Sequence, residues 1–242
     1  PTEKLPLLVV IHGGPTGTSR PTPVSAFVYP VVQWMARGAL VLMPNYRDSA
    51  GYGADFRALN VRNLGVGDAW DVETGVEALI DRGWVDPERV GAMGWSQGGY
   101  ISSFLATASE LFAGNSDWMT NYVNTDIHRF TRNYLEATPW DDPDVYAKTS
   151  PMTYIQGAKT PTLIQHANAD RRVPVPNAYQ LYQGLRDVGV EAELIIFPEL
   201  GLGIAEPKAR LAANWQNWRW FEKHIWGHEI DLPLPEPDEE DE

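Results

Sequence analysis

The stretch from residue 89 to 105 places the strongest constraint on the fold of this chain. A short apolar run enters it, the pattern Gly-x-Ser-x-Gly follows at Gly94-Trp95-Ser96-Gln97-Gly98, and a helix-forming run leaves it. This is the strand–turn–helix order of a nucleophile elbow, whose sharp turn projects the serine hydroxyl from the strand end. Glycines two residues on either side of the serine leave room for that turn. The pattern favours Ser96 as a nucleophile, and the alternative is a glycine-rich βα turn with an incidental serine.

Apolar runs suited to buried strands alternate with amphipathic segments along the chain. We expect strands over 5–11, 39–43, 90–93, 161–165 and 192–197, and helices over 31–37, 68–81, 177–188 and 207–226. Asp86-Pro87-Glu88 is predicted as a turn before the third strand. This alternation indicates an α/β fold with a mainly parallel central sheet flanked by helices. The aromatic-rich segment 117–154 is predicted to form short helices and loops, and it is a candidate cover for the cleft.

Composition narrows the organisation and the partners. The 242 residues contain 43% hydrophobic and 21% charged residues, which suits one large domain over 1–228. The net charge of −13 argues against a nucleic-acid or anionic-membrane partner. Eight of the 32 acids lie in the last 14 residues, so 229–242 is expected to be a disordered acidic tail. No apolar run is long enough to span a membrane.

The absence of cysteine and the identity of the first residue say little about the compartment of the protein. With no cysteine there is no disulfide framework, thiolate metal site or cysteine nucleophile. Because the chain starts at Pro1 without a signal-peptide pattern, we expect a mature or excised segment. The sequence fits any compartment and any oligomeric state.

Two further loops follow predicted strands. The strand at 5–11 ends in His12-Gly13-Gly14-Pro15, whose glycines leave backbone N–H groups unshielded for an oxyanion. The alternative is a plain strand-ending loop. The strand at 39–43 leads to the loop 45–53, in which Tyr52 either packs or presents its phenol at the carboxyl ends of the strands, where open α/β sheets bind ligands.

Five motifs, taken in order, resemble the catalytic domain of the prolyl oligopeptidase family of serine peptidases, which includes acylaminoacyl and dipeptidyl peptidases. They are His12-Gly13-Gly14-Pro15, Asn45-Tyr46-Arg47 with Gly51-Tyr52-Gly53, Gly94-Trp95-Ser96-Gln97-Gly98-Gly99-Tyr100, Asp170-Arg171-Arg172-Val173-Pro174, and Phe197-Pro198 with Gly201 and Gly203. The resemblance covers nearly the whole chain except the tail. It implies the α/β-hydrolase fold.

The resemblance also implies roles for individual residues. Ser96 would be the nucleophile, Asp170 the acid that orients a histidine, and the backbone N–H of Gln97 an oxyanion donor. The second donor is the Tyr52 hydroxyl in some family branches and the backbone near Gly13 and Gly14 in others. The chemistry needs no cofactor and no metal. The substrates would be peptides or, without the family's β-propeller, small esters.

The most consequential departure from the family pattern lies in the loop after the last strand. Family members resemble Gly-His-Gly there, and this chain has Gly201-Leu202-Gly203. Leucine has no lone pair to take the serine proton, so the hydrolase is predicted to be inactive or strongly impaired. All five histidines are expected to be structural or solvated. The least constrained substitute is His128, which lies in the 117–154 segment.

Three further departures add to this prediction. The family's Arg-Gly-Ser is Arg47-Asp48-Ser49, and its His-Gly is His166-Ala167. The connection 111–116 is too short for the central strand that the family places there. The departures together indicate an engineered or inactivated variant. The rival functions are a non-catalytic ligand-binding pseudo-hydrolase and a redesigned site with a different reaction.

Overall fold

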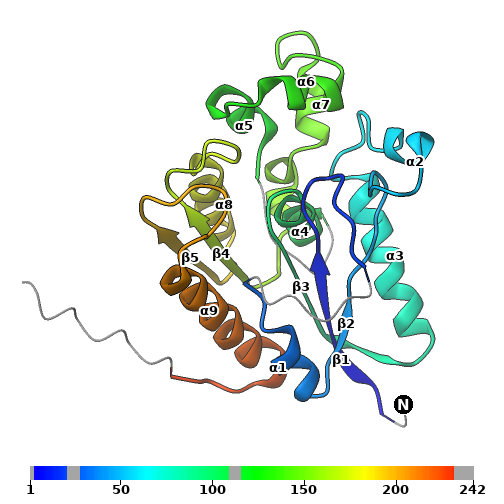
Figure 1. Ribbon diagram of the computed structural model, residues 1–242, viewed down its shortest axis with the longest axis vertical. Helices are drawn as coiled ribbons and strands as arrows, with labels where there is room; N and C mark the ends of the chain where they lie inside the picture. The colour runs from blue at the N-terminus through cyan, green and yellow to red at the C-terminus, as the bar shows by residue number, and fades with distance from the viewer. Residues whose placement is uncertain (1–2, 21–27, 109–115, 232–242) are drawn as a thin grey trace, which may run out of the picture.

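The computed structural model describes residues 3–20, 28–108 and 116–231. Strands and helices alternate along these residues (Figure 1). In chain order they are β1 (Leu5–Ile11), α1 (Val31–Ala36), β2 (Leu40–Leu42), α2 (Ala54–Ala58), α3 (Gly67–Asp81), β3 (Val85–Gly94), α4 (Gln97–Ala108), α5 (Trp118–Asn124), α6 (His128–Leu135), α7 (Pro143–Lys148), η1 (Pro151–Gly157), β4 (Thr162–Ala167), α8 (Pro176–Asp187), β5 (Ala192–Phe197) and α9 (Pro207–Trp226).

The strands pair in parallel, which confirms the α/β-hydrolase fold class predicted from the sequence. Within the described residues they form two sheets, ordered β2-β1-β3 and β4-β5, where the sequence predicts one central sheet. Among the described strands, none of one sheet pairs with a strand of the other, and α9 contacts both sheets. The predicted short connection at 111–116 falls outside the described residues except for Ser116.

The core follows the period of two along β1. Leu7, Val9 and Ile11 point to one face and pack with buried residues of α3 and α4. Leu8 and Val10 point to the other face, against α1 and α9. Every one of these five side chains is nearly or fully buried, so both faces of β1 are covered by helices.

One local prediction is wrong, and one short helix was not predicted. The third strand begins at Val85 rather than at residue 90, because Val85 pairs with Leu5 while Val90 pairs with Leu7. The register shift places Asp86, Pro87 and Glu88 within an irregular part of the strand rather than in the predicted turn, and Arg89 Nε lies 2.7 Å from Asp86 Oδ2. The short helix α2 was not predicted, since its five residues include no buried side chain to produce a pattern.

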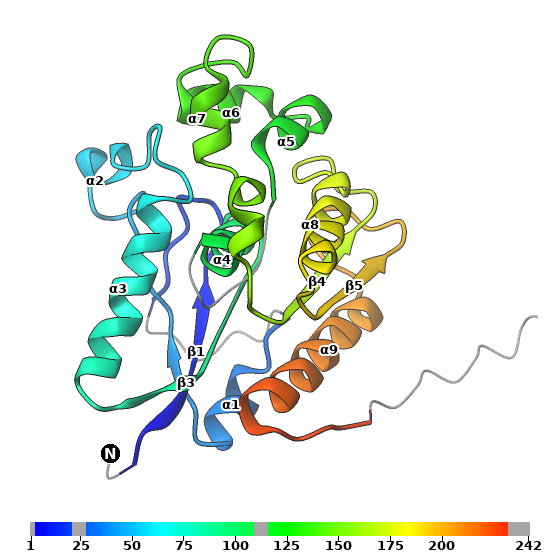
Figure 2. The same ribbon diagram turned by 180° about the vertical axis from the view of Figure 1, so that it is seen from behind.

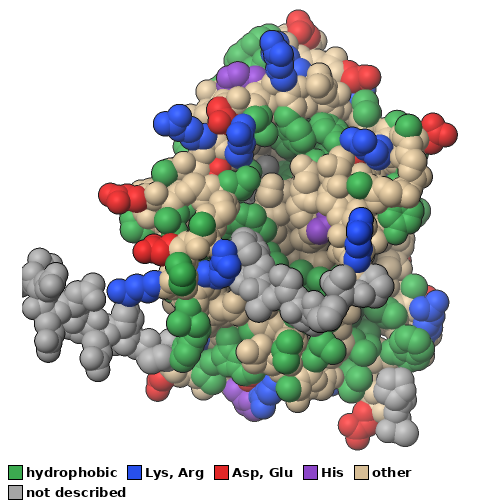
Figure 3. Space-filling view, in the orientation of Figure 1, with side chains coloured by type: hydrophobic (Ala, Val, Ile, Leu, Met, Phe, Trp, Pro, Cys, Tyr) green, Lys and Arg blue, Asp and Glu red, His purple; other side chains and the backbone are tan. Residues whose placement is uncertain are grey.

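The helices α5, α6 and α7 lie beyond the carboxyl ends of the strands (Figures 1 and 2). The segment 117–154 therefore lies over the carboxyl ends of the strands. On the face shown in Figure 3, the described Lys and Arg side chains are scattered singly rather than gathered. None of the described helices has the length and hydropathy needed to cross a membrane.

Candidate active site

The turn between β3 and α4 has the geometry of a nucleophile elbow. Ser96 lies at φ 57°, in the left-handed region that a non-glycine residue seldom adopts. A Cβ on Gly94 would lie 2.1 Å from the carbonyl carbon of Gly98, and one on Gly98 would lie 2.0 Å from the carbonyl oxygen of Ile11. Both glycines are therefore required by close backbone packing, and the strained turn presents Ser96 at the end of its strand.

Asp170 lies in the loop between β4 and α8, with 6% of its surface exposed. Its Oδ1 accepts hydrogen bonds from the backbone N–H groups of Arg172 (2.7 Å) and Val173 (3.0 Å). Burial raises the pKa of this carboxyl, and the two backbone hydrogen bonds offset part of the rise. The loop thus holds one carboxylate oxygen firmly and fixes the direction of the other.

Leu202 lies in the loop that follows β5 and shares a cavity with Ser96. Ser96, Asp170 and Leu202 line one cavity of about 100 Å³. The Trp95 indole Nε1 donates a hydrogen bond to the Leu202 carbonyl oxygen at 2.6 Å, which ties the loop to the elbow. The structure therefore brings together the serine, the acid and the leucine that the sequence singles out.

A second cavity, with a volume of about 260 Å³, also has Ser96 in its wall and shares Val173 and Leu202 with the first. Its apolar lining comes mainly from the segment beyond the strand ends: Trp118, Ile127 and Phe130. Asn121 and Arg172 add polar groups, and Arg172 Nη1 donates to Asp126 Oδ1 at 3.0 Å. The site thus combines a strained serine with an apolar recess that has a polar margin.

Comparison with known proteins fits this geometry. The model of the prolyl oligopeptidase family (Peptidase_S9) matches residues 26–228. The chain belongs to the prolyl oligopeptidase family. It is 31% identical over 241 residues to acylamino-acid-releasing enzyme 1 of Oryza sativa subsp. japonica, covering 91% of this chain and 30% of that protein. The acylamino-acid-releasing enzyme of Arabidopsis thaliana is 29% identical over 234 residues, with 90% and 30% coverage.

Solved structures of this family superimpose on the chain. The acylaminoacyl peptidase of Pyrococcus horikoshii matches with a TM-score of 0.83 and 29% identity, over 96% of this chain and 39% of that one. An acylaminoacyl peptidase in complex with Z-Gly-Gly-Phe-chloromethyl ketone matches with a TM-score of 0.84 and 30% identity, at the same coverage. The chain therefore spans well under half the length of these relatives.

The residues that the resemblance names as oxyanion donors do not all lie close to Ser96. A Cβ on Gly13 would lie 3.3 Å from the Ser96 Cβ, and Gly14 and Gln97 line the 260 Å³ cavity with Ser96. Tyr52 is 55% exposed, and its hydroxyl accepts a hydrogen bond from Asn45 Nδ2 at 3.0 Å. Among the described residues that line the two cavities at Ser96, Tyr52 does not occur. The structure therefore places Gly14 and Gln97, and not Tyr52, at the cavities that Ser96 lines.

One of the two positions where a family glycine is replaced has a backbone conformation that favours glycine. Asp48 adopts φ 79° and is 1% exposed, so a buried carboxylate lies at a strained position. Ala167, at the other such position, is not among the residues with positive φ. Strain therefore arises at one of the two altered glycine positions.

Four of the five histidines lie away from the 100 Å³ cavity. His12 Nε2 is 2.9 Å from Ser49 Oγ, and its ring stacks on Tyr46 at 4.4 Å. His128 packs near Tyr122 of α5, while His224 and His228 lie in and just after α9, beside acidic residues. Neither cavity at Ser96 has His128 among its described lining, so the structure gives it no contact with the nucleophile.

His166 alone among the histidines lines the cavity that Ser96 and Asp170 share. Its Nε2 lies 2.7 Å from the Val173 carbonyl oxygen, which requires a proton on Nε2. Burial lowers the pKa of this histidine, which favours the neutral ring with its proton on Nε2 and its lone pair on Nδ1. This contact supports the structural role expected from the sequence.

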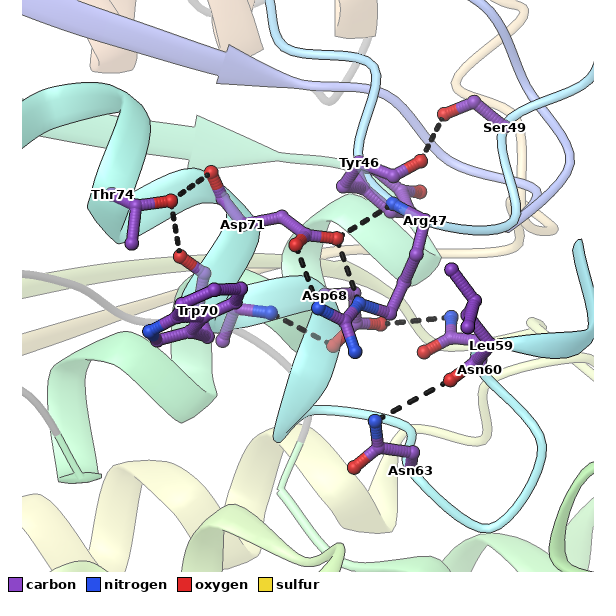
Figure 4. Close-up of polar contacts among 11 residues, drawn as sticks. Tyr46, Arg47, Ser49, Leu59, Asn60, Asn63, Asp68, Trp70, Asp71 and Thr74 are labelled. Atoms are coloured by element: carbon purple, nitrogen blue, oxygen red, sulfur yellow. Dashed lines mark hydrogen bonds and ion pairs between the residues drawn. The ribbon is translucent and has the colours of Figure 1, made fainter. Parts of the chain in front are cut away.

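One buried neighbour of the site, Asp68, was not singled out from the sequence. Asp68 is fully buried, and its Oδ2 accepts hydrogen bonds from Gln97 Nε2 (3.0 Å) and Asn60 Nδ2 (3.2 Å). Figure 4 shows Asp68 beside Asn60 and next to the Arg47–Asp71 ion pair, which joins the 45–53 loop to α3 at 2.7 Å. Asp68 thus fixes the side chain that follows the nucleophile, and no local pattern predicts this tertiary contact.

Proposed function

We propose that this chain is a serine-type acyl-transfer domain that is strongly impaired because Leu202 occupies the position of the general base. The observation that supports it most is the shared cavity: Ser96, on a strained elbow, and Asp170, on a fixed loop, line it together with Leu202. A hydroxyl is a weak nucleophile unless an adjacent base takes its proton. On this proposal the serine, the orienting acid and the oxyanion donors remain, and only the base is missing.

The intact part of the machinery would act as follows. Ser96 Oγ attacks the carbonyl carbon of a peptide or ester, and the negative charge that develops on the carbonyl oxygen is stabilised by backbone N–H groups of Gln97 and the Gly13–Gly14 loop. Each such donor contributes about 3 kcal/mol of transition-state stabilisation. Without a base, residual catalysis of roughly 10³–10⁴-fold over water is what the remaining groups support.

The substrate class follows from the second cavity and from the relatives. The recess lined by Trp118, Ile127 and Phe130 has a volume of about 260 Å³ and would accept an apolar side chain of the substrate. The relatives are named for releasing acylamino acids, and one solved relative holds a peptide analogue that ends in phenylalanine. N-acylated peptides and small esters with an apolar residue at the scissile carbonyl are the proposed substrates.

The test is intact-mass measurement after exposure to a fluorophosphonate, which labels an activated serine. We expect slow labelling of the chain as given, rapid labelling of the Leu202→His variant, and no labelling of a Leu202→His/Ser96→Ala double variant. Equal labelling of the given chain and of Leu202→His, lost in Ser96→Ala, would show that another group activates Ser96 and would overturn the proposal.

The second candidate is a non-catalytic ligand binder, a pseudo-hydrolase. It is favoured by Leu202 together with the preserved 260 Å³ recess, which needs no base to hold an N-acyl peptide. Calorimetric titration with N-acetyl-phenylalanine amide distinguishes it: binding that is equal in Ser96→Ala, with no covalent adduct in Leu202→His, would favour the binder. A redesigned site would instead show a pH-dependent activity that is unrelated to acyl transfer.

A further inference from the structure

A cavity of about 420 Å³ lies between β3 and β4, which belong to different sheets. Its lining includes every residue from 90 to 95, in and just after β3, and every residue from 159 to 163, which lead into β4. A strand that turned one face to a cavity would contribute every second residue. The consecutive lining residues therefore show that both strands turn their backbone edges to this cavity, which we call the slot.

The slot leaves room for one strand. Apart from isolated points, no Cα atom of β3 lies within 8 Å of one in β4. Hydrogen-bonded strands lie about 4.8 Å apart, so two strands with a third between them lie about 9.6 Å apart. The two strands run in the same direction, since the residues that follow their ends, Ser96 and Asp170, line one cavity.

The edges that face the slot have no partner strand among the described residues. There β3 pairs only with β1, and β4 pairs only with β5. An open edge presents a row of backbone N–H and C=O groups. Two side-chain atoms of lining residues, Gln165 Oε1 and His224 Nε2, are also buried without a hydrogen-bond partner in this part of the chain. The slot therefore favours an occupant that carries donors and acceptors along its length.

The helix α9 supplies an apolar wall of the slot through Trp220, Phe221 and Ile225. An extended strand directs successive side chains to opposite faces, so every second side chain of an occupant would meet this wall. The net charge of −13 disfavours an acidic occupant.

We propose that the slot binds an extended segment of another polypeptide as a strand parallel to β3 and β4, with apolar side chains at every second position and no acidic residue. Such a strand hydrogen-bonds to both edges and joins the two sheets into one. Because Ser96 follows β3 and Asp170 follows β4, the bound strand also fixes the separation of these two residues. The binding needs no chemistry at Ser96, so it goes beyond the proposed function and is tested apart from it.

The experiment uses the full chain and a peptide of alternating Val and Thr with blocked ends, six residues long like β4. We expect saturable binding that slows hydrogen exchange at residues 90–95 and 162–166 more than in β2. At a peptide concentration of about 100 times its Kd, the ratio of unfolded to folded protein should fall about 100-fold. Urea unfolding with and without the peptide measures this ratio.

Two N-methylated versions of the peptide are the matched controls. In a strand that is paired on both sides, the N–H groups of the Val residues point to one neighbour and those of the Thr residues to the other. Methylation of the Val nitrogens alone, or of the Thr nitrogens alone, should therefore abolish binding while the side chains stay the same. A peptide that added to the outer edge of β2 or β5 would use one row of N–H groups, so loss of binding in only one version would overturn the proposal.

A pair of variants locates the binding. Ala92→Trp places a large ring at a lining residue and should abolish binding, whereas Ala212→Trp, at an exposed position of α9 outside the described lining, should retain it. Thermal unfolding checks that both variants are folded. If Ala92→Trp does not fold, the two N-methylated peptides decide the outcome without it.

Analytical ultracentrifugation identifies the occupant. A monomer that forms a one-to-one complex with the peptide supports the proposal. A dimer that the peptide dissociates would show that a second copy of this chain fills the slot, and a chain that does not bind the unmodified peptide would show that the slot is closed to strands. Either result would overturn the proposal, and neither bears on the fluorophosphonate labelling of Leu202→His that tests the proposed function.

Discussion

At the residue scale, the side chain of Gln97 donates a hydrogen bond to Asp68, a fully buried acid. Burial raises the pKa of Asp68 to about 6, and hydrogen bonds from Asn60, Gln97 and two backbone N–H groups offset only part of the rise. An acid whose pKa is higher in the folded than in the unfolded state opposes folding when it is ionised. The cost is absent below the unfolded pKa near 4, grows as the pH rises to about 6, and is complete above that.

Asp68→Asn removes this cost while it preserves the size of the side chain. We expect the free energy of unfolding of the variant, relative to the given chain, to rise by about 3 kcal/mol between pH 4 and pH 7, as a pKa difference of about two units implies. Urea unfolding at pH 4, 5, 6 and 7 measures it, with Asp144→Asn on the exposed start of α7 as the control. A difference between the two chains that is independent of pH would contradict this account.

At the element scale, the elbow between β3 and α4 tolerates no side chain at its second glycine. A Cβ on Gly98 would meet the Ile11 carbonyl oxygen at 2.0 Å, and backbone cannot move aside as a flexible side chain can. Gly98→Ala should therefore lower the free energy of unfolding by roughly 3 kcal/mol, the upper part of the range for overpacking.

The matched control for Gly98→Ala is Gly201→Ala, because a Cβ on Gly201 meets no atom within 4 Å. We expect its effect to lie within about 0.5 kcal/mol. Urea unfolding of both variants gives the comparison. Equal stability of the two variants would mean that the elbow is looser than its backbone geometry indicates.

An element could be predicted from the sequence when neighbouring residues mark its ends, and not when its ends depend on contacts with distant residues. The helix predicted over 207–226 agrees with α9, because Pro207 at its first turn and Gly227 in the left-handed conformation mark its ends locally. The start of β3 depends on pairing with Leu5, far away in the sequence, so the local turn residues mislead. In the candidate site, the Gly-x-Ser-x-Gly pattern singles out Ser96 and the family resemblance singles out Asp170, whereas the contact between Asp68 and Gln97 arises only in three dimensions.

At the scale of the whole molecule, α9 connects the two sheets. Phe221 packs on β3 so closely that a Cβ on Gly91 would lie 2.6 Å from its ring. Asn217, one turn earlier, accepts a hydrogen bond from Gln165 of β4 at 3.0 Å. Because β3 and β4 do not pair within the described residues, this helix carries much of the contact between the two halves.

Phe221→Ala should accordingly destabilise the protein by about 3–5 kcal/mol, the range for truncating a buried aromatic ring. Leu211→Ala, on the exposed side of the same helix at 59% exposure, should cost less than about 1 kcal/mol. Chemical denaturation followed by tryptophan fluorescence compares the two. Similar costs would show that α9 does not hold the sheets together.

The central claim is that one side chain, Leu202, separates this fold from acyl transfer by Ser96. The most direct measurement is the pH dependence of kcat/KM for hydrolysis of N-acetyl-phenylalanine p-nitrophenyl ester by Leu202→His and by the given chain. We predict that the variant gains roughly 10²–10⁴-fold, the contribution of a positioned base, with a rate that rises through a pKa of about 6.5 as histidine loses its proton. An unchanged rate and the same pH profile in both chains would contradict the account.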